Sequence, residues 1–544
     1  MLRRYSFVIS CLVLLAVVGV AAEEPVDLEM VNKIRYEGFH RSQVMETLEH
    51  LSDVIGSRRT GSPGMQAANE WTRDRMAGWG MENAAVEPWG EFGRGWSYSR
   101  VAVDMLEPRQ TSLYAIPMAW TPGTDGPVEG EAMMVKISEK DDFEKYAGKL
   151  DGKILLMDKE RPLPEDVALP DGNAMMRSRY TQDVIPEEWS GRGRKRVRKR
   201  FKFSRELREF MANENVLATV RISEYDHGVI EADRDRSYGK GQATLPPTVY
   251  MASNHYNQIA RLLDNDHTVR LRVDIDAQFH EDDLQAYNTV AEIPGHGSKR
   301  KELVLLGGHL DSPHAATCAT DNAASCSVVM EAARILQAIE ARPRRTIRVV
   351  LWSGEEEGLL GSRGYVAKHF ATRPISEEPE ELELPLHRRE RLWPITPLPD
   401  HGRVSAYFNL DNGAGKILGI FAEDNPAAAP IFEAWLKPFH DLGAADVLLR
   451  HTSGTDHMAF DAVGLPAFQF VQDMRDYMSR THHTNLDDVD YVRRENLMQA
   501  SAIMASFVYH AATRDELMPR KPIPQKPPKW DEPEDEEDDE DDDE

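Results

Sequence analysis

Cysteine is scarce in this chain, which has only three in 544 residues. So few cysteines exclude the disulfide framework that supports many small secreted domains. Cys318 and Cys326 lie on either side of Asp321 in the sequence. We expect both to be buried free thiols, and a disulfide between them is the alternative.

Long apolar runs are also few. The run from Ser6 to Val20 follows two arginines and precedes two alanines. This order of basic, apolar and small residues is typical of an export signal. We therefore expect residues 1–22 to be a signal peptide, cleaved near Ala22, and the mature protein to be secreted or periplasmic. An uncleaved membrane anchor is the alternative. No later run is long and apolar enough to cross a bilayer, so we expect no membrane span after signal removal.

Positive charge is in deficit. The chain has 65 Lys and Arg against 91 Asp and Glu, which gives a formal net charge of −26. Half of it, 13 negative charges, lies in residues 531–544. The remaining acidity argues against nucleic-acid binding. The basic run from Arg192 to Arg200 is the exception. We expect this run to be a solvated loop or helix face, with binding of an anionic partner as the alternative.

An apolar content of 41% is ample for a large core, and the length exceeds one ordinary domain. In residues 30–80, apolar residues recur at the spacing typical of helices. Between about 110 and 268, short apolar runs alternate with polar loops, which predicts a small β-rich unit.

The tail from Pro519 is rich in proline and lysine and then acidic. We expect this tail to be disordered and held away from the folded part.

After about residue 285 the pattern changes to strand, loop and helix in alternation. This alternation predicts an α/β fold with a mostly parallel central sheet that is covered on both faces by helices. Residues 372–402 interrupt the pattern, since they are rich in Pro, Glu and Arg and lack periodicity. We expect a loop excursion near the functional site. The expected strands are 303–306, 347–352, 405–410 and 465–471, and the expected helices are 323–339, 359–370 and 495–512.

Histidines and carboxylates follow four of these strands. In an open α/β sheet, ligands bind where the strands end. Each residue alone has an ordinary explanation, such as a helix cap or a solvated face, but together they predict a hydrolytic metal site with its own general base. The residues are His309 and Asp311, Glu355 and Glu356, Asp411, and His482 and His483.

Five sequence elements follow one another along the chain: His309-Leu310-Asp311-Ser312, Asp321-Asn322-Ala323-Ala324, Glu355-Glu356-Glu357-Gly358, Asn409-Leu410-Asp411 and His483-Thr484-Asn485-Leu486-Asp487. Their order resembles that of one enzyme family. This is the family of co-catalytic dizinc exopeptidases, which contains bacterial zinc aminopeptidases, glutamate carboxypeptidases and carboxypeptidase Q. The segment Ile55–Ser62 also resembles the opening of these enzymes, and Tyr146–Ile154 resembles a protease-associated domain.

The resemblance implies two zinc ions per chain and a role for each residue. One zinc would be bound by His309 and Asp411, the other by Glu356 and His483, and Asp321 would bridge the two. Glu355 would be the general base, which must not coordinate the metal because it takes a proton from water. Asp311 would hold the ring of His309 in its tautomer.

One departure from the family pattern is the distance between Glu356 and Asp411, which are 55 positions apart in the sequence. This spacing exceeds the one expected for the family, and the excess matches the excursion at 372–402. Asp411 is still the best candidate because it follows a predicted strand in an Asn-Leu-Asp context.

We therefore expect an exported zinc exopeptidase that acts on short peptides and has no nucleic-acid partner. The end from which it trims is open, because Arg363, Arg475 and Arg480 near the motifs could all bind a terminal carboxylate. A homodimer is also open. The alternatives are an acyltransferase of the glutaminyl-cyclase kind and a catalytically inactive binding homologue.

The expected units are a signal peptide (1–22), the first part of the peptidase domain (23–110), an inserted protease-associated-like domain (111–268), the catalytic domain (269–515) and a disordered acidic tail (516–544).

Overall fold

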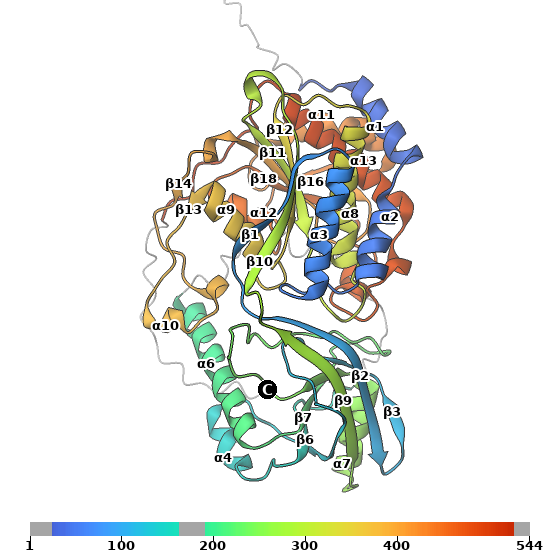
Figure 1. The fold of residues 1–544 in the computed structure, drawn as a ribbon, viewed down its shortest axis with the longest axis vertical. Helices are drawn as coiled ribbons and strands as arrows, with labels where there is room; N and C mark the ends of the chain where they lie inside the picture. Colours follow the sequence, from blue (N-terminus) through green and yellow to red (C-terminus); the bar gives the residue numbers. More distant parts are fainter. Residues whose placement is uncertain (1–23, 163–190, 527–544) are drawn as a thin grey trace, which may run out of the picture.

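The computed structural model describes residues 24–162 and 191–526. The expected signal peptide and the acidic segment 531–544 lie outside the described residues. Two eight-stranded sheets, each with its own hydrophobic core, form the upper and lower parts of the molecule in Figure 1.

The first sheet contains the strands predicted to surround the site. The strands, in sheet order, are β1 (Glu82–Glu91), β10 (Gln285–Ile293), β12 (Thr346–Trp352), β11 (Leu303–His309), β15 (Val404–Asn409), β18 (Ala467–Gln472), β16 (Ile417–Phe421) and β17 (Asp446–Leu448). The four central strands run parallel to one another. On one side β10 runs antiparallel to its two neighbours, and on the other β16 runs antiparallel to β18 and parallel to β17. Every residue of the central strand β11 is buried, which fits its continuous apolar sequence.

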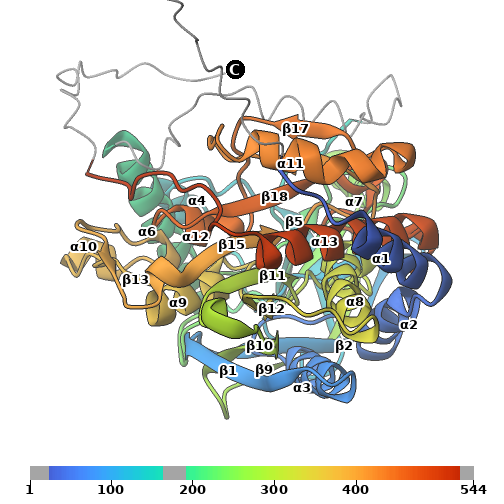
Figure 2. The same cartoon turned by 90° about the horizontal axis from the view of Figure 1, so that it is seen from above.

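Helices cover both faces of this sheet, which confirms the predicted fold class (Figure 2). The larger core contains α8 (Ala324–Ala338), which is buried along most of its length because it packs between the sheet and neighbouring helices. Its neighbours in that core are α1 (Leu28–His40), α2 (Val44–Glu49), α3 (Pro63–Gly78), α11 (Ala429–Leu436) and α13 (Arg494–Thr513), whereas α9 (Leu360–His369) and α12 (His457–Asp461) pack on the other face.

The second sheet forms the lower part of the molecule. Its long strands β2 (Gly95–Glu107) and β9 (Arg270–His280) pair along their whole length, so this sheet extends beyond the expected segment 111–268 at both ends. Helices α4 (Phe143–Tyr146), α6 (Gly191–Asn213) and α7 (Ser253–Asp264) belong to the same part. The other strands are β3 (Thr111–Leu113), β4 (Ala115–Pro117), β5 (Val128–Met134), β6 (Lys153–Leu156), β7 (Ala218–Ile222) and β8 (Thr248–Met251).

The loop between β7 and β8 returns from the second sheet to the first. Its Glu231 forms a β-bridge with Thr484, the residue after His483. Its Arg234 forms a β-bridge with Ala119. The second sheet therefore contributes residues to the edge where the predicted site lies.

The excursion at 372–402 forms a closed loop. Its base is the short pair β13 (Ala371–Thr372) and β14 (Thr396–Pro397), and it contains α10 (Pro379–Leu382) and η6 (Leu386–Arg388). In Figure 1, α10 lies beside α6. The side chain of Glu381 is fully buried there and forms salt bridges with Arg194 and with Arg198, the latter at 2.7 Å. The basic run thus lies on a helix, one of the two forms expected for it, but the expectation of a solvated face is wrong for Arg194 and Arg198, which contact the excursion.

The segment after α13 departs from expectation. Met518 is only 1% exposed, and Ile523 packs against the smaller core of the first sheet. Lys521 Nζ donates to the carbonyl oxygen of Glu423 at 2.7 Å. The expectation that residues from 516 onward are held away from the fold is therefore wrong for residues up to 526. The reason is that Met518 is buried and Ile523 packs against the core of the first sheet.

Two further expectations concern cysteine and the membrane. Cys318 and Cys326 are buried free thiols, as expected, and they do not form the alternative disulfide. Within 24–162 and 191–526, no helix combines the length and the apolar character that crossing a bilayer requires.

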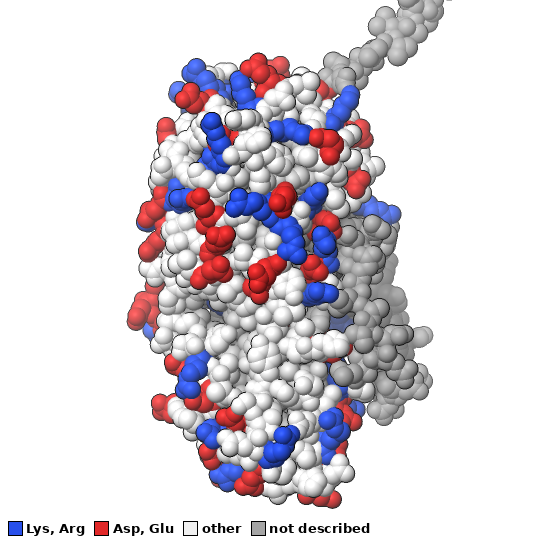
Figure 3. Space-filling model, turned by 90° about the vertical axis from the view of Figure 1, so that its right-hand side faces the viewer, with Lys and Arg blue, Asp and Glu red and all other residues white. Residues whose placement is uncertain are grey.

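Acidic and basic side chains are interspersed on the side of the molecule shown in Figure 3, so neither sign forms a continuous surface there.

Candidate active site

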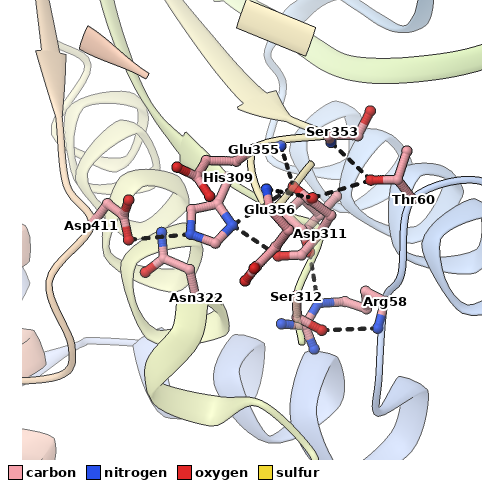
Figure 4. Close-up of polar contacts among 12 residues, drawn as sticks. Arg58, Thr60, His309, Asp311, Ser312, Asn322, Ser353, Glu355, Glu356 and Asp411 are labelled. Carbon is pink, nitrogen blue, oxygen red and sulfur yellow. Dashed lines mark hydrogen bonds and ion pairs between the residues drawn. The ribbon is translucent and has the colours of Figure 1, made fainter. Parts of the chain in front are cut away.

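The predicted site residues meet at one edge of the first sheet. His309 ends β11, Glu355 and Glu356 follow β12, and Asp411 follows β15. Because these strands run parallel, their carboxyl ends reach the same edge. Figure 4 shows His309 and Asp411 pointing toward each other, with the two glutamates beside them.

Two clusters share Asp321, which lies in the turn before α8. In the first, His309 Nε2 is 3.1 Å from Asp411 Oδ1 and 3.2 Å from Asp321 Oδ1. In the second, His483 Nε2 is 3.3 Å from Asp321 Oδ2 and 3.4 Å from Glu356 Oε2. The two carboxylate oxygens of Asp321 thus face different histidines.

Asp311 supports both the histidine and the glutamate pair. The Nδ1 atom of His309 lies 2.9 Å from the backbone oxygen of Asp311, so Nε2 remains for the cluster. The Asp311 carboxylate accepts hydrogen bonds from the backbone amides of Glu355 and Glu356, each at 3.3 Å, and from Thr60 Oγ1 at 3.1 Å. One buried side chain therefore links the ends of β11 and β12 (Figure 4).

Sequence reasoning gave Asp487 no role, although it stands in the last motif. Its carboxylate accepts hydrogen bonds from the backbone amides of Thr320 at 2.6 Å and Asp321 at 3.0 Å. Burial raises the pKa of Asp487 to about 7, and the nearby Asp321 charge adds to the shift. Asp487 holds the turn that carries Asp321.

The motif at Ile55–Ser62 supports the same loops. Arg58 is fully buried and donates to the carbonyl oxygens of Leu310 at 2.8 Å and Cys318 at 3.0 Å. Its backbone amide donates to Ser312 Oγ at 3.0 Å, a contact drawn in Figure 4. The sequence motif is thus explained by an arginine that ties together the segments on either side of the site.

The third glutamate of the motif has a different partner from the first two. Glu357 forms a buried salt bridge with Arg59 at 3.2 Å. The guanidinium of Arg59 also lies over the ring of Trp120, 5.3 Å from its centre, and contacts His314 Nδ1 at 3.0 Å. Glu357 is therefore engaged in a structural network, and Glu355 and Glu356 remain for the cavity.

The donor set suits metal ions. Oxygen Oε1 of the buried Glu356 has no hydrogen-bond partner. Burial raises the pKa of Glu355 well above its usual range, and of the charges around it His309 lowers that pKa whereas Asp411 raises it. Burial lowers the pKa of His483, but the carboxylates of Glu356 and Asp321 raise it to about 9. Crowded carboxylates and imidazoles of this kind are the ligands of zinc sites, and divalent cations would compensate their charge.

Three overlapping groups have ligand atoms within 4.8 Å of one another. Two of them contain His309 and correspond to the expected residues. The third includes His482 as well as His483, and the two rings stack with centroids 3.9 Å apart. The groups are His309, Asp321 and Asp411; His309, Glu355 and Glu356; and Asp321, His482 and His483.

A cavity of about 350 Å³ opens beside the cluster. Of the three arginines proposed as carboxylate ligands, Arg363 lines this cavity, whereas Arg475 lines a smaller neighbouring pocket. Arg234 and Arg236 also line it, and both come from the loop between β7 and β8. Sequence reasoning missed these two because they lie more than 70 residues before His309, where the first of the five elements begins.

Comparisons with known proteins agree with this geometry. Residues 288–508 match peptidase family M28. Carboxypeptidase Q of Bos taurus is 22% identical over 92% of this chain and 91% of its own length. Aminopeptidase YwaD of Bacillus subtilis strain 168 is 23% identical over 40% of this chain and 43% of its own.

Solved structures share the fold. A peptidase M28 precursor from Shewanella amazonensis SB2B has a TM-score of 0.62 at 24% identity, covering 92% of this chain and 99% of that one. A zinc aminopeptidase from Bacillus subtilis has a TM-score of 0.51 at 16% identity, covering 91% and 97%. The chain is therefore a metallopeptidase whose residues 288–508 match peptidase family M28, and the predicted resemblance to the dizinc exopeptidases is confirmed.

Proposed function

We propose that this protein is an exported, zinc-dependent exopeptidase that hydrolyses terminal bonds of short peptides with two zinc ions per chain. The observation that carries this proposal is the position of Asp321, whose two oxygens face His309 and His483 separately. A carboxylate between two ligand sets is suited to bridge two cations, because it lowers their mutual repulsion.

The residues at the cluster would divide into ligands and a base. His309 and Asp411 would hold one zinc, Glu356 and His483 the other, and Asp321 both. When bound, the zinc ions would acidify a shared water and polarise the scissile carbonyl. Asp311 would act as a positioning residue, since its backbone oxygen fixes the ring of His309.

Glu355 would act as the general base. Its backbone amide is held by Asp311, and its side chain lines the cavity where a substrate would lie. Burial raises the pKa of this carboxyl, so its ionised form is a stronger base than an exposed glutamate. The side chain is thus suited to accept a proton from water and to deliver it to the leaving amine.

The shape of the site supports short substrates. A volume of about 350 Å³ is at the lower end of the roughly 300–1,000 Å³ typical of small-molecule sites. The loop between β7 and β8 and the excursion both contribute to its wall. A long peptide would have to pass these segments, whereas a dipeptide would not.

The remaining expectations are parts of the same proposal. We propose removal of residues 1–22 on export and a protease-associated-like unit within the second sheet; a homodimer stays open. The complete donor set for two ions favours the hydrolase over a one-zinc acyltransferase of the glutaminyl-cyclase kind. An intact Glu355 favours it over an inactive binding homologue.

The experiment is a chelation and reconstitution series on the full-length protein with a panel of blocked and unblocked dipeptides. We expect hydrolysis to be lost after chelation and restored by zinc. Hydrolysis that persists in a metal-free preparation would contradict the proposal, and so would a zinc-loaded protein that cleaves none of the panel.

A further inference from the structure

The cavity beside the metal cluster carries four arginines, which we call the arginine wall: Arg234, Arg236, Arg363 and Arg388. They reach the cavity from three different segments. Arg234 and Arg236 lie in the loop between β7 and β8, Arg363 lies on α9, and Arg388 ends η6 in the excursion. The proposed hydrolysis assigns none of them a task.

Two of these arginines are held against the segment that carries the glutamates. Arg234 donates from Nη2 to the backbone oxygen of Glu356, and its buried Nε has no hydrogen-bond partner. Arg363 donates from Nη1 to the backbone oxygen of Gly358 at 2.9 Å. Their guanidinium groups are therefore fixed beside the proposed metal ligands.

Positive charge is crowded on this side of the cavity. Arg236 is half-buried and forms no salt bridge within residues 24–162 and 191–526. Burial lowers its pKa, and the charge of Arg234 lowers it further. Burial, together with the charges of Arg363 and Arg373, also lowers the pKa of the neighbouring Arg391 to about 9. Burial is the largest cause of both shifts, and the crowded guanidinium groups add to it. The carboxylate of Asp233, which lies 3.5 Å from Arg234, offsets part of the shift of Arg236.

The carboxylates that line the cavity are already engaged. Asp321, Glu356 and Asp411 are proposed metal ligands, and Glu355 is the proposed base. Glu357 pairs with Arg59. Two divalent cations at the cluster would make the cavity net positive. This excess of positive charge rests on the proposed function, which supplies both ions.

We propose that the arginine wall binds a carboxylate of the substrate, so that the preferred substrates are short peptides with a free carboxyl group beside the scissile bond. The forked guanidinium matches a carboxylate in shape and charge. Recognition of a substrate amine would require a carboxylate that the proposed hydrolysis does not use. Within the described lining of the cavity only Glu357 is left, and its fully buried side chain pairs through Oε1 with Arg59, while Oε2 has no hydrogen-bond partner. The carboxylate could be the peptide's C-terminus or an acidic side chain.

The kinetic test uses the zinc-loaded full-length protein and matched substrates. Alanyl-phenylalanine and its C-terminal amide differ only in the terminal carboxylate, whereas alanyl-glutamate and alanyl-glutamine differ only in the side chain. We expect the acid of one pair to be cleaved with a higher kcat/KM than its neutral partner. The pair that shows the preference identifies the source of the carboxylate.

Variants assign the preference to the wall. Changing Arg236→Ala or Arg388→Ala should reduce the acid-to-neutral ratio of kcat/KM about 10- to 100-fold, as expected for a hydrogen bond to a charged group. Arg236→Lys should restore part of it. The exposed Arg342 provides the matched control, and Arg342→Ala should leave the ratio unchanged.

Binding provides a second readout that does not need turnover. Calorimetry on zinc-loaded Glu355→Gln should show tighter binding of the preferred acid than of its neutral partner, and Arg236→Ala in that background should remove the difference. Equal binding or equal cleavage within both pairs would overturn the inference while leaving a metallopeptidase. A protein that cleaves none of the four substrates would overturn the proposed function, and calorimetry would still decide the inference.

Discussion

The carboxylate of Asp487 accepts a hydrogen bond from the backbone amide of Asp321 at 3.0 Å. It also accepts one from the preceding amide of Thr320 at 2.6 Å. The two residues are 166 positions apart in the sequence, yet one fixes the turn on which the other could bridge two metal ions. The metal site is thus built by residues outside its ligand set as much as by the ligands.

Asp487→Ala should lower zinc affinity about 10- to 100-fold, the usual effect of removing a group that orients a metal ligand. Asp487→Asn keeps one acceptor oxygen and should have an intermediate effect. Competition with a chelator of known affinity measures this. The control is Asp490→Asn, since Asp490 is exposed. Wild-type affinity in Asp487→Ala would show that the turn is held by other contacts.

Glu355→Gln and Glu356→Gln should separate chemistry from metal binding. Glu355→Gln cannot accept a proton and should lose about 10²- to 10⁴-fold in kcat with zinc content nearly unchanged. Glu356→Gln should lose zinc, because an amide is a poorer ligand than a carboxylate. Zinc analysis and kinetics on both proteins check this, and the reverse pattern would exchange the two roles.

Glu381→Gln should loosen the excursion, because Glu381 is the buried partner of both Arg194 and Arg198. Hydrogen exchange should increase within 372–402, and longer peptides should be cleaved faster relative to dipeptides. Glu383→Gln is the matched control, since Glu383 is about half exposed and pairs with Arg205 at 3.3 Å. Unchanged exchange and an unchanged length preference would make the excursion an inert surface loop.

Truncation should distinguish the packed end of the chain from the acidic segment. Removal of residues after Arg514 deletes the buried Met518 and should destabilise the fold by at least about 2 kcal/mol. Removal of residues after Lys526 should leave thermal unfolding, zinc content and turnover of neutral dipeptides unchanged. A large loss of activity on removal of only the residues after Lys526 would give the acidic segment a structural role.

The sequence allowed the fold and the cluster to be predicted because both depend on local patterns. Each apolar strand is followed by its polar residue, and parallel strands bring such residues to one edge. The geometry brings Asp411 to His309 despite the intervening excursion, since the excursion closes on itself through β13 and β14.

Other features could not be predicted because they depend on contacts between distant segments. No local pattern indicates that Arg236 reaches the cavity from the second sheet. The apolar side chains of Met518 and Ile523 are isolated in a Pro-rich segment, so only the folded surface shows where they pack. The basic run was recognised, but its partner Glu381 lies in a segment without periodicity.

The most direct test of the central claim is the zinc content of the full-length wild-type protein after equilibration with zinc and removal of excess ion. Elemental analysis should give two zinc ions per chain, and Asp321→Ala should lower affinity at both positions because Asp321 faces both histidines. A stoichiometry of one, or an Asp321→Ala protein that still binds two ions with wild-type affinity, would contradict the account.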